Sequence, residues 1–125
     1  TVANTYPAIA IDVETERPTL GGVTGGLSGR AVKPMSLLLV WKVAGAVDVP
    51  VIGSGGVETA EDVVEYLLAG AAAVEVGSAM LRDLGAPAAM LAGLEDFMAR
   101  KGYRRLTDFR GKARKNQSTM QSEEA

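Results

Sequence analysis

The chain has 125 residues, 47% of them hydrophobic and 22% charged, which is the composition of one soluble globular domain rather than of a disordered segment. Its formal charge of −2 gives no basic field for a nucleic acid, and the lack of cysteine and histidine excludes disulfides, thiolate metal sites and a histidine base, so no metal site is expected. No apolar run approaches the roughly 20 residues that cross a bilayer, so we expect no membrane span and a cytoplasmic protein.

Short strands and a glycine-rich loop are predicted for the first thirty residues. A strand-like step at residues 1–5 is followed by "AIAIDV" (8–13) and by the polar turn "ETERP" (14–18), a pattern that indicates a hairpin. Residues 21–30, "GGVTGGLSGR", contain five glycines. Such a stretch lets the backbone approach a ligand closely or adopt positive φ.

A helix is expected from Pro34 to about Ala46, because proline suits a first turn and apolar residues recur at helical spacing. Together with Trp41, the recurring residues are interpreted as a packing face; they are Met35, Leu38, Leu39, Val43 and Ala46. The segment "VPVIGSGG" (49–56) is a short apolar run without polar alternation, which is typical of a strand buried in a parallel sheet.

Capping signals bound the next helix, predicted at residues 60–69. Thr59 and Asp62 have the spacing of a capping box, and Gly70 stands where a helix-ending glycine is expected. Glu61 and Asp62 lie in the first turn, where acidic residues complement the helix dipole, so a catalytic role is not expected for either.

A second strand and a last helix follow in the same order. Residues 72–76 form a short apolar strand that Glu75 interrupts, and a buried Glu75 would need a partner, so we weigh a role supporting the site. The strand ends at Gly77 and Ser78, and a helix is predicted over about 87–102.

The alternation of strand, glycine turn and helix is the signature of βα units with parallel strands. Only three strands are clear, which is too few to close a barrel, so we expect the chain to be one part of a larger α/β fold. Its start at Thr1 is consistent with the cut end of something longer. Residues 112–125 are polar and without a period, and they are expected to form a disordered tail.

The glycine turns after two of the strands predict an anion site. Gly55 and Gly56 lack a β-carbon, so a phosphate can approach the backbone amides where the next helix starts, and Ser54 can add a hydroxyl. Gly77 and Ser78 would place a second set of donors beside the first, as in the phosphate cup of (β/α)₈ barrels. The alternative is a pair of plain tight turns. Neither a Rossmann fingerprint nor a Walker A loop is present.

Four blocks of sequence resemble the C-terminal portion of dihydroorotate dehydrogenase, a flavin-dependent (β/α)₈ enzyme of pyrimidine biosynthesis. They are "ANTYPAIAIDVET", "GGLSGRAVKP", "VPVIGSGGVETAEDVVEYLLAGAAAVEVGSA" and "LTDFRGKA". The resemblance implies that residues 1–111 form the C-terminal part of a TIM barrel, about three βα units, with FMN as cofactor. "ANT" followed by "AIDVET" most resembles the class 1 type B enzymes. The resemblance to these enzymes implies an oligomer, a partner subunit with FAD and an iron–sulfur cluster, and electron transfer to NAD.

The resemblance also implies ligands for particular residues. Asn4 and Thr5 would hydrogen-bond the carboxylate and ring of orotate, although an asparagine at a strand end is by itself a common turn former. The residues that would contact FMN are Ala3, Gly29 and, at its phosphate and ribityl end, Gly55, Gly56, Gly77 and Ser78. On this interpretation Gly55→Val should abolish flavin binding by filling the space of the phosphate.

The same resemblance places no catalytic residue in this chain. In the family order the proton-abstracting cysteine and a lysine near the flavin come before the first block, and Lys33 belongs to another block and cannot replace that lysine. The chain alone is therefore expected to be inactive. Arg30 stands where the family commonly has proline, which could alter how the glycine loop closes over the flavin.

Two other functions remain open at this point. One is a free-standing, non-catalytic half-barrel that binds a phosphate-bearing ligand. The other is part of a dihydropyrimidine dehydrogenase-like flavoenzyme, which pairs a related flavin domain with pyrimidine reduction. The glycine turns alone do not decide between these and dihydroorotate oxidation, whereas the "NT", "AIDVET" and "GGLSG" blocks favour the latter.

Overall fold

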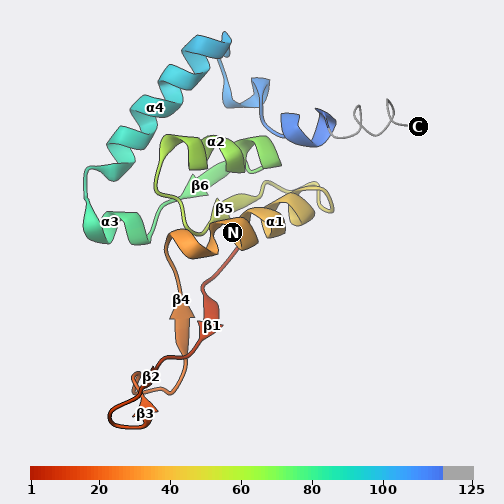
Figure 1. Ribbon diagram of the computed structural model, residues 1–125. Coiled ribbons are helices and arrows are strands. Elements are labelled where there is room, and N and C mark those ends of the chain that lie inside the picture. Colours follow the sequence, from red (N-terminus) through yellow and green to blue (C-terminus); the bar gives the residue numbers. More distant parts are fainter. Residues whose placement is uncertain (117–125) are drawn as a thin grey trace.

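Residues 1–116 are described by the structure, a computed structural model. They form an arm, residues 6–27, and a mixed α/β body from which the arm projects (Figure 1). In chain order the elements are β1 (Tyr6–Ala8), β2 (Ile11–Asp12), β3 (Arg17–Pro18), β4 (Gly25–Leu27), η1 (Arg30–Val32), α1 (Lys33–Ala44), β5 (Ile52–Ser54), α2 (Ala60–Ala69), β6 (Ala73–Glu75), α3 (Ser78–Arg82), α4 (Ala86–Lys101) and η2 (Leu106–Asp108).

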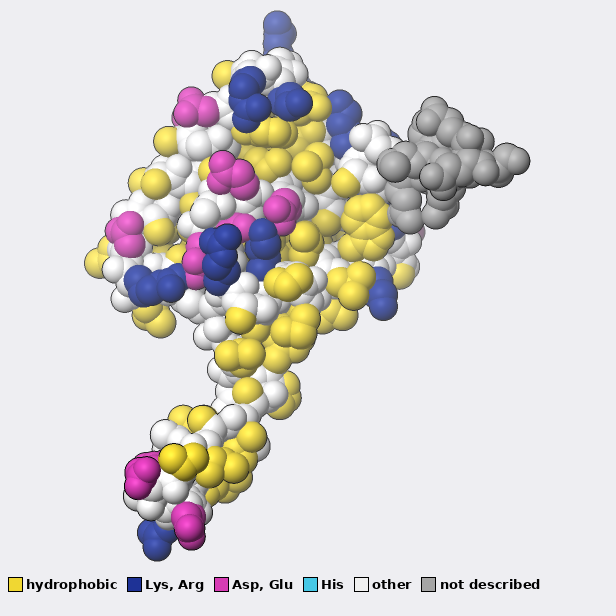
Figure 2. Space-filling model, in the orientation of Figure 1, with side chains coloured by type: hydrophobic (Ala, Val, Ile, Leu, Met, Phe, Trp, Pro, Cys, Tyr) yellow, Lys and Arg dark blue, Asp and Glu magenta, His cyan; other side chains and the backbone are white. Residues whose placement is uncertain are grey.

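The arm consists of two antiparallel strand pairs. At its base β1 pairs with β4, with Tyr6 opposite Leu27. At its tip β2 pairs with β3, so the hairpin predicted around residues 14–18 is present. Part of the glycine-rich stretch is thus a strand, β4, because β1 pairs with it. The sequence of the stretch alone does not suggest this pairing. Figure 2 shows the arm joined to the body by a narrow neck, and its apolar side chains are exposed, with Ile11 62% exposed.

In the body, β5 lies between two parallel neighbours. One edge of β5 pairs with β6, and on the other edge Val2 forms a parallel bridge with Gly53. The Val2 amide donates to the Ile52 carbonyl at 2.8 Å, and the Ser54 amide donates to the Val2 carbonyl at 2.6 Å. The strand predicted at residues 1–5 is therefore reduced to this one bridge. α1 contacts β5 and α2 contacts β6, so both helices lie against the strands.

The order of strand, turn and helix agrees with the predicted βα units. The described strands leave the sheet open, and the assignment of residues 1–111 to the C-terminal part of a (β/α)₈ barrel stays a prediction. None of the helices within residues 1–116 is long and apolar enough to cross a membrane.

Both ends of α2 are as predicted from the sequence. The Thr59 hydroxyl accepts from the amide of Asp62, and the Asp62 side chain accepts from the amide of Thr59, which completes the capping box. Gly70 ends the helix with φ of 118°. α4 likewise ends at Gly102, whose φ is 72°. These helix ends need only local residues, which is why the sequence predicts them well.

The predicted packing face of α1 is only partly correct. Trp41 and Val43 pack against the core, but Met35, Leu38 and Leu39 are exposed, and the buried residues of this helix are Ser36 and Val40. Ser36 is buried because its hydroxyl lies 3.1 Å from the Tyr6 hydroxyl at the base of the arm, a partner that a helical hydrophobic pattern does not reveal. The helix also begins at Lys33 and ends at Ala44, slightly earlier than predicted.

The hydrophobic core has two clusters, one on each side of α2. The first comprises Val40, Val51, Val57, Tyr66, Ala69, Ala71, Ala79 and Met90. The second comprises Val64, Leu67, Leu94 and Phe109. The ring of Phe109 is fully buried and lies edge-on to Phe97 at 5.4 Å between centroids. This second cluster holds α4 and the segment after it against α2.

The segment after Gly111 differs from the expected disordered tail. Residues 112–116 are helical. The guanidinium of Arg114 lies 4.9 Å from the centroid of the Trp41 ring and donates to the carbonyl of Trp41. A specific contact with α1 therefore orders these residues, and the prediction of disorder is wrong for them. The rest of the predicted tail lies outside the described residues.

Candidate functional site

A pocket of about 390 Å³ is lined by residues from the base of the arm and from the body. Its volume falls within the range of small-molecule and cofactor sites. All the residues assigned from the sequence to FMN or orotate line it, and they are Ala3, Asn4, Thr5, Gly29, Gly55, Gly56, Gly77 and Ser78. Ser54, proposed from the sequence as a hydroxyl donor, also lines it. Residues that the sequence did not single out complete the lining: Leu27, Ser28, Val32, Val57, Glu58 and Leu81.

Four chain segments meet at this pocket because of the parallel strand order. The turns after β5 and β6 lie at the same edge, since the carboxyl ends of neighbouring parallel strands coincide. The segment before β1 reaches that edge through Val2, and the Ala3 amide donates to the Ser54 carbonyl at 3.1 Å. Gly29 follows β4, whose pairing with β1 returns the chain to the same place.

The turn after β5 requires glycine for reasons of the protein's own packing. Gly55 has φ of 125° and Gly56 has φ of 67°, both in the region that favours glycine. A β-carbon on Gly55 would overlap the Ser36 hydroxyl. One on Gly56 would lie 2.8 Å from the backbone nitrogen of Lys33. Gly55→Val would therefore act by disrupting the fold, and the expectation that it fills the phosphate space is corrected.

Two amides of this turn are free to bind a ligand. Within residues 1–116, the amides of Gly56 and Val57 donate to no protein acceptor. The next two amides, of Glu58 and Thr59, donate to the Asp62 carboxylate at 2.8 and 2.9 Å. Asp62 thus already satisfies the amides of Glu58 and Thr59, and Ala60 and Glu61 at the start of α2 do not line the pocket. The donors available to an anion in the pocket come from the turn, not from the helix end that the sequence suggested.

Asn4 and Thr5 also have unused hydrogen-bonding groups. The side-chain oxygen of Asn4 accepts from the amide of Thr5 at 2.8 Å, which fixes the orientation of the Asn4 amide. Its NH₂ group makes no hydrogen bond within the described residues, and neither does the hydroxyl of Thr5. Both groups belong to pocket-lining residues, so a polar ligand in the pocket can use them.

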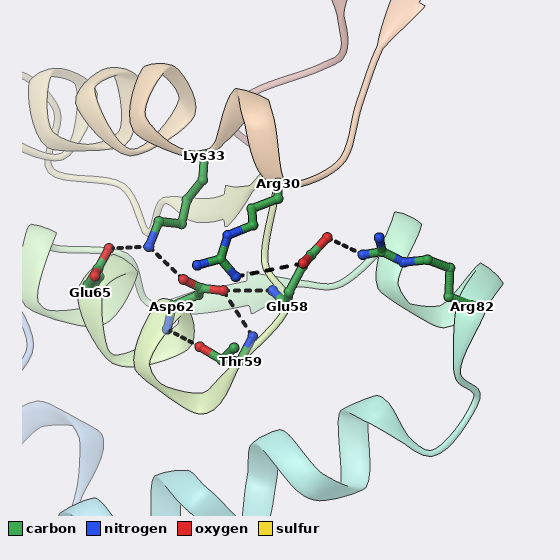
Figure 3. A network of polar contacts seen from close by, with 7 residues as sticks. All are labelled: Arg30, Lys33, Glu58, Thr59, Asp62, Glu65 and Arg82. Carbon is green, nitrogen blue, oxygen red and sulfur yellow. Dashed lines mark hydrogen bonds and ion pairs between the residues drawn. The ribbon is translucent and has the colours of Figure 1, made fainter.

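A network of charged side chains surrounds the turn (Figure 3). Lys33 pairs with Asp62 at 2.5 Å and with Glu65 at 2.8 Å. Glu58, which lines the pocket, pairs with Arg30 at 3.8 Å and with Arg82. The sequence suggested that Arg30 could alter closure of the glycine loop. In the structure Arg30 forms an ion pair with Glu58, which follows the turn after β5.

The network shifts the protonation equilibria of its buried members. Burial raises the pKa of Asp62, but the bonds from Lys33 and from the two turn amides outweigh it, so the pKa lies below the usual 3.8. Burial lowers the pKa of Lys33, but the hydrogen bonds that its ammonium donates to Asp62 and Glu65 outweigh this, and the pKa lies above 10.5. Both groups are therefore charged at neutral pH.

The structure does not place Glu75 where it could support the site. It is exposed on β6, and its carboxylate accepts from the hydroxyl of Thr1 at 3.2 Å. Glu75 is not part of the pocket lining. The sequence missed Lys33 instead, because its partner Asp62 lies 29 residues away and the capping box indicates only the local half of the arrangement.

The fold and pocket define an α/β protein with a glycine-lined site at the carboxyl ends of neighbouring parallel strands. The family model of dihydroorotate dehydrogenase matches residues 1–98. The chain belongs to the dihydroorotate dehydrogenase family.

Several relatives are about half identical to the chain. The "Dihydroorotate dehydrogenase B (NAD(+)), catalytic subunit" of Desulforudis audaxviator is 50% identical over 110 residues, which is 88% of this chain and 36% of that protein. The protein of the same name from Geobacter sulfurreducens is 52% identical over 99 residues, 79% of this chain and 32% of that protein. The "Putative dihydroorotate dehydrogenase A (fumarate)" of Solibacter usitatus is 48% identical over 110 residues, 88% of this chain and 36% of that protein. The chain spans about a third of the length of these relatives.

Proposed function

We propose that this chain supplies the flavin-phosphate site and part of the substrate site for the FMN-dependent oxidation of dihydroorotate to orotate in pyrimidine biosynthesis. The observation that carries the proposal is the meeting of four distant segments at one pocket, with two backbone amides left without a protein acceptor. Membership of the family supports the reaction class. The activity belongs to the whole protein, because this chain matches only about a third of the length of its relatives.

The pocket suits the phosphate end of FMN. A phosphate needs close approach to amide donors, and the turn that lines the pocket offers the amides of Gly56 and Val57, which donate to no acceptor within residues 1–116. Gly77 and Ser78 line the same pocket, and no atom lies within 4 Å of the place where a Gly77 β-carbon would stand. We assign the phosphate and ribityl end to these four residues, and further contacts with FMN to Ala3 and Gly29.

Asn4 and Thr5 are proposed to hold the substrate. Their unused amide and hydroxyl groups are hydrogen-bonding partners for the carboxylate and ring of orotate or dihydroorotate. FMN, when bound, supplies the redox chemistry by accepting the hydride. The reaction also needs a base for one proton. Glu58, the carboxylate in the described lining, is ion-paired with two arginines, so we assign only binding to this chain.

The wider assembly is proposed from the relatives. The words "B (NAD(+)), catalytic subunit" in their names support a separate electron-transfer subunit, which we propose carries FAD and an iron–sulfur cluster in an oligomeric enzyme. We further propose that β5, α2 and β6 belong to the C-terminal part of a (β/α)₈ barrel spanning residues 1–111 of this chain.

Ligand titration of the full protein that contains this chain tests the proposal. FMN and riboflavin share the ring and ribityl chain and differ by the phosphate, so a working phosphate site should bind FMN at least about tenfold more tightly. Fluorescence quenching measures both affinities, and dihydroorotate oxidation is assayed in parallel. Equal affinity for the two flavins would contradict the assignment of a phosphate site, and failure to oxidise dihydroorotate would contradict the assignment of the reaction.

A further inference from the structure

Lys33 connects two walls of the pocket. It is the first residue of α1, and its backbone nitrogen and β-carbon are each 2.8 Å from the place where a Gly56 β-carbon would stand. Its ammonium reaches across to Asp62 on α2, and the Lys33 side chain is only 20% exposed (Figure 3). The residue therefore lies along the whole turn from Gly56 to the first turn of α2.

Asp62 holds this turn by hydrogen bonds, and in doing so it places a negative charge near the proposed phosphate site. One carboxylate oxygen accepts from the amides of Glu58 and Thr59, and the other accepts from Lys33. The Asp62 side chain is 4% exposed, so water screens its charge weakly. The amides that Asp62 accepts from directly follow those of Gly56 and Val57 in the turn, so an unpaired carboxylate here would repel an anion approaching the latter two.

We infer that Lys33 is a positioning residue of the phosphate site: it holds Asp62 in place at the turn and cancels its charge, so that the turn amides can receive a dianionic phosphate. The inference rests on the proposed function. Lys33 does not line the pocket and acts through Asp62 and Gly56. Glu65 is the second partner of the ammonium, but its side chain is 45% exposed and it accepts from none of the turn amides.

The experiment compares the ratio of FMN affinity to riboflavin affinity in variants of the full protein. A loss of stability or of the flavin-ring site lowers both affinities alike, whereas a defect at the phosphate lowers the ratio. Lys33→Met removes the charge and keeps the length of the side chain. Lys42→Met, the same substitution at an exposed position of α1, is the matched control, and Glu65→Gln tests the second partner.

Lys33→Met should lower the FMN-to-riboflavin ratio by about tenfold, the scale expected when a buried charged group loses its partner. Lys42→Met and Glu65→Gln should leave the ratio within about twofold of wild type. The double variant Lys33→Met, Asp62→Asn has no charge at either position and should recover most of the lost ratio. This recovery separates charge cancellation from simple structural support.

Two results would overturn the inference. One is an unchanged ratio in Lys33→Met, and the other is a double variant no better than Lys33→Met. Lys33→Gln keeps a hydrogen-bond donor for Asp62 and replaces Lys33→Met in the comparison if the latter does not fold. The wild-type protein distinguishes a failure of this inference from a failure of the proposed function. If the wild type does not prefer FMN to riboflavin, the assignment of the phosphate site is wrong, whatever the Lys33 variants show.

Discussion

The hydroxyl of Tyr66 donates a 2.7 Å hydrogen bond to the carbonyl oxygen of Gly55. Tyr66 is fully buried on α2, and burial raises its pKa to about 12, so the hydroxyl keeps its proton and stays a donor at any physiological pH. In a trans peptide the carbonyl of one residue and the amide of the next point in opposite directions. By holding the Gly55 carbonyl toward the core, Tyr66 directs the Gly56 amide the other way, away from the core.

Tyr66→Phe should therefore weaken both the fold and the site. The buried Gly55 carbonyl loses its donor, which is expected to lower the free energy of unfolding by about 1–3 kcal/mol. FMN affinity should fall more than riboflavin affinity, because the Gly56 amide is no longer held in one orientation. Denaturant unfolding and flavin titration measure the two effects. Tyr103→Phe is the control, since the Tyr103 hydroxyl meets only the exposed Lys112, and a similar loss in both variants would contradict the explanation.

Gly56 and Gly77 should respond differently to alanine. At Gly56 the new β-carbon meets the backbone of Lys33 and φ is 67°, so Gly56→Ala is expected to lower the free energy of unfolding by about 1–3 kcal/mol. At Gly77 φ is −112° and the space is open, so Gly77→Ala should change it by less than about 0.5 kcal/mol. Gly77→Ala should nevertheless reduce FMN affinity if the phosphate lies there. Full affinity in this stable variant would remove Gly77 from the site.

Asn4→Ala should separate substrate binding from cofactor binding. The variant loses the amide that we assign to orotate, and it leaves the glycine turns intact. Orotate affinity is expected to fall about tenfold in the full protein, with FMN affinity unchanged. Isothermal titration with orotate makes the measurement. Thr24→Ala, in the arm and outside the pocket, is the control, and undiminished orotate affinity in Asn4→Ala would show that the role of Asn4 is that of a turn residue alone.

Acid should weaken the fold through Asp62. Its pKa is depressed in the folded state, so the unfolded chain binds a proton more readily, and the stability that it contributes is present above about pH 4 and is lost as the pH falls through the folded value. Lys33 has a raised pKa, so its contribution is complete at neutral pH and is lost only above about pH 10. The unfolding free energy measured from pH 7 to pH 2 should fall less steeply in Asp62→Asn. Parallel curves for the variant and wild type would contradict this assignment.

Arg114→Ala should loosen residues 112–116 from α1. The side chain covers the ring of Trp41, the only tryptophan in the chain, so its removal should shift tryptophan emission to longer wavelength as the ring gains water. The loss of the cation–π contact is expected to lower the free energy of unfolding by about 0.5–1 kcal/mol. Arg110→Ala, at an exposed position four residues earlier, should leave the emission unchanged. An unshifted emission maximum in Arg114→Ala would show that the ring is covered by something else.

The features that the sequence predicted well are those specified by neighbouring residues. Thr59, Asp62 and Gly70 define both ends of α2 within twelve positions, and glycines after apolar strands mark the turns that form the pocket. Parallel strand order then brings these turns together, because the carboxyl ends of the strands share one edge. Local turn chemistry thus predicted that Gly55, Gly56, Gly77 and Ser78 would meet, whereas Ala3, Asn4, Thr5 and Gly29 were assigned to the same site only by the family resemblance.

The features that the sequence missed depend on partners distant in the chain. Ser36 is buried with its hydroxyl 3.1 Å from that of Tyr6, whereas Met35, Leu38 and Leu39, which the hydrophobic spacing of α1 favours, are exposed. Gly26 lies in a strand because the chain before it folds back alongside. The charge on Asp62 is cancelled by a lysine that precedes it by 29 residues. Each of these needs the tertiary arrangement, and none leaves a periodic signal.

The pocket lining runs from Ala3 to Leu81, and α4 and the segment after it take no part in it. Those later residues pack on α2 from the other side, through the cluster around Leu94 and Phe109. Within residues 1–116 the pocket is thus built by the first part of the chain, and the second part supports it by packing against α2. An exchange of one apolar side chain for another of similar volume in the second part should therefore leave the pocket lining unchanged. No short peptide cut from the sequence can carry the site, because its walls are brought together only by folding.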